Sequence, residues 1–107
     1  MAHKGTTPST AFQHTAQETQ NCQSICVQTI QYCLQVGGSH VEPSHMQLMQ
    51  DCAEICETTA TMLLRSSLQH NQVTAACADI CERCARSCDR FTGDAQMKAC
   101  ADECRRC

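Results

Sequence analysis

Cysteine accounts for 12 of the 107 residues, and ten of these cysteines form five Cys-x-x-x-Cys pairs. The pairs are Cys22/Cys26, Cys52/Cys56, Cys77/Cys81, Cys84/Cys88 and Cys100/Cys104, and Cys33 and Cys107 extend the first and last sets. In an α-helix, positions i, i+4 and i+7 lie on one face. Thiolates are soft ligands that select Cu(I), Zn(II) or iron–sulfur clusters. The spacing therefore predicts helical stripes of sulfur ligands.

The stripe that contains Cys52 and Cys56 begins with other donor types. His45 lies seven residues before Cys52 and Met49 lies three before it, so all four share one helical face. We expect His45 and Met49 to be metal ligands at an entrance to the thiol core, with Met97 at the same end. An exposed histidine at a helix start and a methionine that only fills the core remain alternatives. The other histidines are expected at the surface (His3, His14, His40 and His70).

Helical periodicity organises most of the chain into four segments. They are expected at about 16–36, 44–69 with Ser44 as N-cap, 72–90, and 94–107 with Asp94 as N-cap. Gly37-Gly38 should end the first helix. Short connections imply antiparallel neighbours. The expected fold is all-α: an antiparallel up-down four-helix bundle with a cysteine-lined core over residues 16–107, preceded by a flexible or weakly helical arm over residues 1–15.

Composition narrows the functional classes. The length suits one domain, and the net charge of −3 without a basic run gives no footprint for nucleic acid. No segment approaches the ~20 apolar residues of a membrane span, and the polar N-terminus does not resemble a secretory signal. We therefore expect a soluble cytoplasmic protein, a compartment in which clustered cysteines favour metal or redox chemistry. Aromatic residues are scarce, so a chain this small needs a staple such as bound metal.

Geometry and charge favour Cu(I) as the bound ion. Side chains at i and i+4 have β-carbons about 5–6 Å apart, and two sulfurs on one linear ion need roughly 4.6 Å, taking twice a metal–sulfur bond of ~2.3 Å. Each Cu(I) replaces one proton, whereas each zinc ion held by four thiolates buries a net charge of about −2. With bridging thiolates, the capacity approaches about one Cu(I) per cysteine.

Other interpretations remain open. The paired spacing is also found in helical hairpins stapled by disulfides, and zinc or iron–sulfur binding in a redox protein uses the same ligands. No Ser-His-Asp, paired-carboxylate or phosphate-loop arrangement is evident, so we do not expect an enzyme.

Three stretches, 52–56, 76–88 and 97–107, carry most of the Cys-x-x-x-Cys pairs, and they resemble the bacterial four-helix-bundle copper storage proteins. The resemblance extends over roughly 22–107 and is closest to the cytosolic, cysteine-rich branch. It implies many Cu(I) ions bound by core cysteines, an entrance that carries His or Met, and a homo-oligomer such as a tetramer. The sequence departs from that branch in having fewer cysteines, with His45 where relatives can carry another cysteine.

Overall fold

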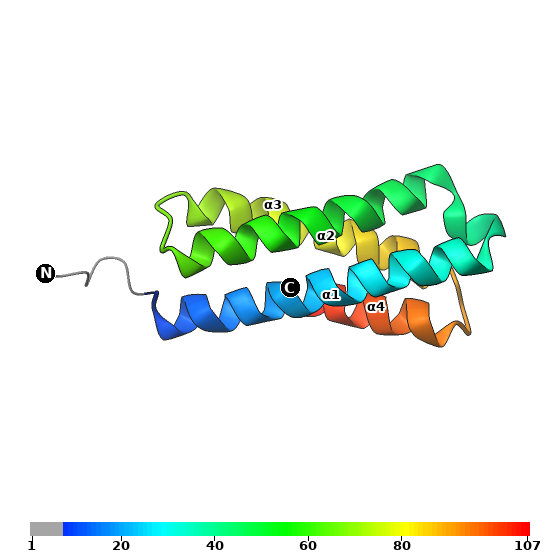
Figure 1. Ribbon diagram of the computed structural model, residues 1–107, viewed down its shortest axis with the longest axis horizontal. Coiled ribbons are helices and arrows are strands. Elements are labelled where there is room, and N and C mark those ends of the chain that lie inside the picture. The colour runs from blue at the N-terminus through cyan, green and yellow to red at the C-terminus, as the bar shows by residue number, and fades with distance from the viewer. Residues whose placement is uncertain (1–7) are drawn as a thin grey trace, which may run out of the picture.

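The computed structural model describes residues 8–107 and contains four α-helices in this part of the chain. They are α1 (Thr10–Val36), α2 (Pro43–Leu64), α3 (His70–Asp89) and α4 (Ala95–Arg106), with a short 3-10 helix, η2 (Gly38–Val41), between the first two. Consecutive helices run antiparallel, and each packs against two neighbours, with α4 returning to α1 (Figure 1). The expected all-α four-helix bundle is confirmed.

Side-chain caps explain where two of the helices begin, and a glycine explains where the first helix ends. The Ser9 hydroxyl accepts a hydrogen bond from the Phe12 N–H at 3.0 Å, and the Asp94 carboxylate accepts one from the Met97 N–H at 3.2 Å. Each bond satisfies one of the free amide groups at a helix N-terminus. Gly37 ends α1 with φ of 74°, a left-handed conformation that suits glycine. The predicted roles of Gly37 and Asp94 are therefore confirmed.

Three predicted helix boundaries were wrong. α1 begins at Thr10 rather than near Ala16, so residues 10–15 of the expected arm belong to this helix. Residues 1–7 lie outside the described residues, and for them the flexible or weakly helical arm stays a prediction. α2 begins at Pro43, because the Glu42 carboxylate accepts from the Ser44 and His45 amides in place of a Ser44 cap. α2 ends at Leu64, followed by a tight turn in which Ser66 has φ of 55°.

The bundle differs between its two ends because α4 has only 12 residues whereas α1 has 27. In Figure 1, α4 lies beside one half of α1, and beyond α4 the helices α1, α2 and α3 form the other end of the bundle, which we call the three-helix end. A small apolar cluster fills this three-helix end (Phe12, Ala16, Ala60 and Leu63). Within the described residues, no helix combines the length and hydropathy needed to cross a membrane.

Candidate metal centre

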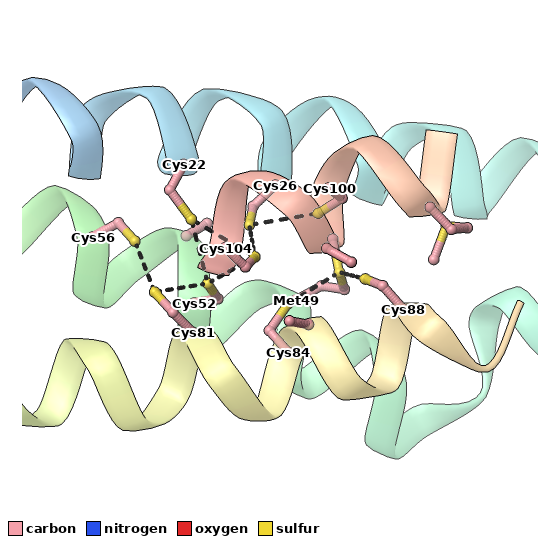
Figure 2. Close-up of a cluster of buried hydrophobic side chains, with 14 of the residues drawn as sticks. Cys22, Cys26, Met49, Cys52, Cys56, Cys81, Cys84, Cys88, Cys100 and Cys104 are labelled. Atoms are coloured by element: carbon pink, nitrogen blue, oxygen red, sulfur yellow. Dashed lines mark hydrogen bonds between the residues drawn. The ribbon is translucent and has the colours of Figure 1, made fainter. Parts of the chain in front are cut away.

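Cysteine forms the core of the four-helix half. Eleven of the twelve cysteines are buried and Cys107 is half-buried, and the structure holds all of them as free thiols. All four α-helices contribute, because each predicted stripe of thiols faces the bundle axis (Figure 2). Leucine or phenylalanine would normally fill these positions, so sulfur replaces the usual hydrocarbon at the centre.

Nine cysteines form what we call the all-thiol middle (Cys22, Cys26, Cys52, Cys56, Cys77, Cys81, Cys100, Cys104 and Cys107). Neighbouring sulfurs lie 3.5–3.9 Å apart, and most of the contacts join different helices; the Cys52 and Cys56 sulfurs, for example, each lie 3.5 Å from the Cys81 sulfur. Three groups of four sulfurs lie within 4.8 Å of one another and share members (Cys22, Cys26, Cys52, Cys104; Cys22, Cys52, Cys56, Cys81; Cys56, Cys77, Cys81, Cys107).

The remaining donors form what we call the mixed-donor end (Cys33, His45, Met49, Cys84, Cys88 and Met97). The Cys33 sulfur lies 3.6 Å from His45 Nε2 and 3.8 Å from the Met97 sulfur. The Met49 sulfur lies 3.5 Å from the sulfurs of both Cys84 and Cys88 (Figure 2). The predicted gathering of thiol, thioether and imidazole at one end of the bundle is therefore present, although ligation itself stays a prediction.

His45 is fully buried, so it is not an exposed histidine at a helix start. Its Nδ1 lies 2.7 Å from the Ser87 hydroxyl, which also accepts a hydrogen bond from the Arg90 guanidinium at 3.2 Å. Burial, aided by the positive charge of Arg90, lowers the pKa of His45, so the ring is neutral at pH 7. A neutral imidazole held by Nδ1 presents Nε2 to Cys33, an arrangement typical of a metal-binding histidine.

The mixed-donor end is covered by what we call the plug, the side chains of Phe91, His40 and Tyr32, which the sequence did not indicate. The Phe91 ring lies 4.2 Å from the His40 ring and 5.0 Å from the His45 ring, measured between centroids. His40 Nε2 and the Tyr32 hydroxyl both lie 2.8 Å from one Asp94 carboxylate oxygen. Asp94 thus ties α1 and η2 to the start of α4, and Phe91 and His40 cover the donors below.

The histidines that were expected at the surface differ in how far they are exposed to solvent. His14 is exposed as expected, whereas His40 has only 15% of its side chain exposed and pairs with Asp94, so the expectation for His40 was wrong. His70 is half-buried against the Phe12 ring, and His3 lies outside the described residues. Spacing relative to the cysteines could not identify His40, because it lies on η2, outside the four helices that carry the stripes.

Two thiols of the core have raised pKa values, which favour their protonated form in the metal-free protein. Burial, followed by the nearby Cys100 and Asp94 charges, raises the pKa of Cys33 to about 11. Contact with Cys100, followed by Cys104, raises the pKa of Cys26. Thiols with raised pKa values bind metal ions by releasing protons, so ion binding is coupled to pH.

Sulfur spacing in the centre fits several metals. A tetrahedral zinc site with bonds of ~2.3 Å needs sulfurs roughly 3.8 Å apart, which the contacts of Cys22 with Cys104 (3.7 Å) and of Cys56 with Cys77 (3.8 Å) match. A linear ion needs roughly 4.6 Å, which sulfurs within the four-thiol groups also satisfy after small rotamer changes. The sulfur distances are therefore compatible with either a four-coordinate or a linear soft-metal ion. The choice between Zn(II) and Cu(I) depends on the net charge that each would leave in the core.

The fold and the thiol core define a helical-bundle protein built to hold soft metal ions. The sequence profile of the family described as copper storage protein matches residues 8–107. The chain therefore belongs to the copper storage protein family.

One solved structure is similar to this chain over most of its length. The crystal structure of a protein from Nitrosospira multiformis, determined by a structural genomics consortium, superposes with a TM-score of 0.74 at 35% sequence identity. The match covers 89% of this chain and 92% of the other. No protein with curated function matches the sequence closely enough to count as a relative.

Proposed function

We propose that this protein stores or sequesters multiple Cu(I) ions, with the thiolates of all twelve cysteines as ligands and His45 and Met49 at the entrance. The observation that carries the proposal is the set of overlapping four-thiol groups buried in the all-thiol middle. Because the groups share Cys22, Cys52, Cys56 and Cys81, an ion in one group lies next to an ion in another. Shared ligands are the arrangement expected of bridged Cu(I)–thiolate clusters rather than of separate sites.

Charge supports Cu(I) over Zn(II). The Lys and Arg side chains among residues 8–107 are exposed and lie outside the thiol core. The ion pairs of Arg83, Arg105 and Lys98 are with surface carboxylates. A core of Cu(I) thiolates stays as neutral as the thiols it replaces, because one proton leaves for each ion that binds. Zinc with four thiolates leaves a net charge of about −2 per site without a cation beside it, which a buried site disfavours.

The mixed-donor end supports the choice of entrance. Thioether and imidazole donors are neutral, so an ion bound there is held less strongly than among thiolates and can move on. The Met49 sulfur lies 3.5 Å from the sulfurs of both Cys84 and Cys88, so an ion held by the thioether has two thiols of α3 within reach. The Phe91 plug must move aside for an ion to pass.

Storage rather than catalysis fits the burial. Every candidate ligand except Cys107 is buried, so a bound ion has no open position facing solvent at which a substrate could react. We place the protein in the reducing cytoplasm, where twelve thiols can stay reduced. We also propose a homo-oligomer, a tetramer by the family resemblance. The apolar side chains of Val27 and Leu34 on α1, which are 49% and 57% exposed, support an interface on this helix.

The deciding experiment is anaerobic Cu(I) titration of the reduced protein against a competing chelator. We expect saturation near one ion for each cysteine, about twelve. Saturation at one or two equivalents would contradict the storage proposal. The same titration after loading with Zn(II) should show Cu(I) displacing zinc, because thiolates favour the softer ion.

Two further measurements address the alternatives. Counting free thiols on freshly isolated, unreduced protein should find nearly all of them, whereas a disulfide-stapled scaffold predicts almost none. Visible absorbance would reveal an iron–sulfur cluster, while Cu(I) thiolates are colourless.

A further inference from the structure

One buried hydroxyl beside the thiol core has no hydrogen-bond partner. Thr59, on α2, is fully buried, and its Oγ1 meets neither a donor nor an acceptor among residues 8–107. Leaving a buried hydroxyl unpaired is unfavourable, and native proteins rarely do so. Thr59 therefore needs an explanation that the metal-free fold does not supply.

Other helical threonines in this chain satisfy themselves locally. The hydroxyls of Thr29, Thr61 and Thr74 donate to the carbonyl oxygens four residues earlier, at 2.7, 3.1 and 2.7 Å. The same bond is open in principle to Thr59, because α2 is regular helix around it. The Thr59 hydroxyl does not form this bond, so helix geometry alone does not account for its orientation.

The neighbours of Thr59 are thiols. Thr59 lies three residues after Cys56, on the same face of α2, and the Cys56 sulfur lies 3.8 Å from the Cys77 sulfur on α3. Thr59 therefore lies one helical turn from the contact between Cys56 and Cys77. Its hydroxyl is close to the Cys77 sulfur, although no hydrogen bond joins the two in the metal-free structure.

We propose that Thr59 is a positioning residue for the bound metal, whose hydroxyl donates a hydrogen bond to the Cys77 thiolate once that sulfur holds Cu(I). When an ion binds, the Cys77 thiol releases its proton to solvent and its sulfur keeps the electron pair that bonds the metal. The sulfur then carries partial negative charge and becomes a better acceptor than the thiol was. Hydrogen bonds of this kind, from groups that do not touch the metal, orient and tune its ligands.

This inference rests on the proposed function and predicts effects of opposite sign in the two states. Without metal, the Thr59 hydroxyl is unpaired, so removing it should stabilise the chain. With metal, the hydroxyl is paired with a thiolate, so removing it should weaken retention of the ions near Cys77. A purely structural role would move both states in the same direction.

The test compares Thr59→Val, which keeps the shape and removes the hydroxyl, with Thr59→Ser, which keeps the hydroxyl. Melting of the reduced metal-free proteins should show Thr59→Val raising Tm by roughly 4–8 °C. Transfer of Cu(I) from the loaded proteins to a chelator should show Thr59→Val releasing its weakest-held ions at about tenfold lower chelator concentration, with Thr59→Ser close to wild type. Thr29→Val is the matched control, since its hydroxyl is already bonded to Ile25 and Gln96.

Each outcome decides the matter. A raised Tm together with weakened copper retention in Thr59→Val, and neither in Thr29→Val, supports the inference. Unchanged copper retention in Thr59→Val, or a loss that Thr59→Ser shares, overturns it while leaving storage intact. A wild-type chain that takes up no Cu(I) overturns storage and this inference together.

Discussion

The all-thiol middle and the mixed-donor end use the same helices but different chemistry. In the middle, nine sulfurs of one type contact one another across all four helices. At the end, three thiols share the space with two thioethers and an imidazole that is oriented by Ser87 and covered by Phe91. Uniform anionic ligands favour retention, while mixed neutral ligands under a plug favour controlled exchange. The difference indicates that capacity and kinetics are separate properties of this bundle.

The largest expected effect comes from breaking the centre of the all-thiol middle. Cys52 and Cys81 lie 3.5 Å apart, and between them they belong to all three four-thiol groups. The double change Cys52→Ser with Cys81→Ser should lower Cu(I) capacity by about two to four ions, because each bridging thiolate serves two ions. Anaerobic titration measures the loss, with far-UV circular dichroism to confirm the fold.

Cys33→Ser is the matched control at the mixed-donor end, and it should cost about one ion at most, since its nearest donors are His45 and Met97. An equal loss of capacity from the single change and the double change would contradict the division between the two regions.

Removal of the neutral donors should affect kinetics more than capacity. In the double variant His45→Ala with Met49→Ala, we expect Cu(I) transfer rates to change by about tenfold, while capacity falls by about one or two ions, because the thiolates remain. Stopped-flow transfer from a Cu(I) chelator measures the rate. Met62→Ala, a half-buried methionine on the same helix near the three-helix end, is the control. A large loss of capacity with an intact fold would place His45 and Met49 deeper in the store than proposed.

The plug should control access without binding metal itself. Phe91→Ala removes the ring that lies over His45, so uptake should become faster by a few-fold at unchanged capacity. Phe12→Ala removes the other phenylalanine, which packs on His70 at the three-helix end, and should leave uptake unchanged. Both losses of buried aromatic surface destabilise the fold, so thermal melts of the two variants separate stability from access. Equal rates in both variants would show that Phe91 does not limit uptake.

The smallest effect concerns Asp94, which holds the plug. Burial opposes ionisation of Asp94, but hydrogen bonds from His40 and Tyr32 and from the Met97 amide outweigh it and lower its pKa. A lowered carboxyl pKa stabilises the folded state above the unfolded value of about 3.9, and this contribution is lost as pH falls below it. Asp94→Asn should cost up to about 1 kcal/mol near pH 6 and much less near pH 3.

Thermal melts of the metal-free protein across this pH range provide the measurement. Asp102→Asn serves as the control, because its pair with Lys98 is exposed and contributes little. A difference between Asp94→Asn and wild type that stays constant with pH would mean that the carboxylate charge is not what holds the plug.

Periodicity alone was sufficient to predict the bundle and its thiol core. Sulfur at i, i+4 and i+7 has only one consistent placement on a helix, and Gly37 and Asp94 mark ends through chemistry that is local to the chain. The gathering of Cys33, His45 and Met49 followed from antiparallel order, because short connections decide which helix ends meet.

Contacts between distant residues could not be predicted in the same way. The positions of Ser87, Phe91 and His40 around the entrance depend on how η2 and the turn after α3 fold over the bundle. The end of α2 was also predicted too late, because the helix ends before Ser66, whose left-handed backbone is a conformation that serine seldom adopts. The unpaired hydroxyl of Thr59 is evident only from the coordinates, since its sequence context matches that of the other helical threonines.

The short α4 has a consequence for the life of the empty protein. Because α4 stops partway along α1, the other end of the bundle is filled by an apolar cluster that contains no candidate metal ligand (Phe12, Ala16, Ala60 and Leu63). The packing of this cluster therefore does not depend on bound copper. Local stability varies along a protein, and backbone amides beside such a cluster exchange slowly with solvent. In the metal-free protein we therefore expect amide hydrogen exchange to be slowest near Leu63 and fastest in α4. Folding of a newly made chain can then begin at the three-helix end before any ion binds.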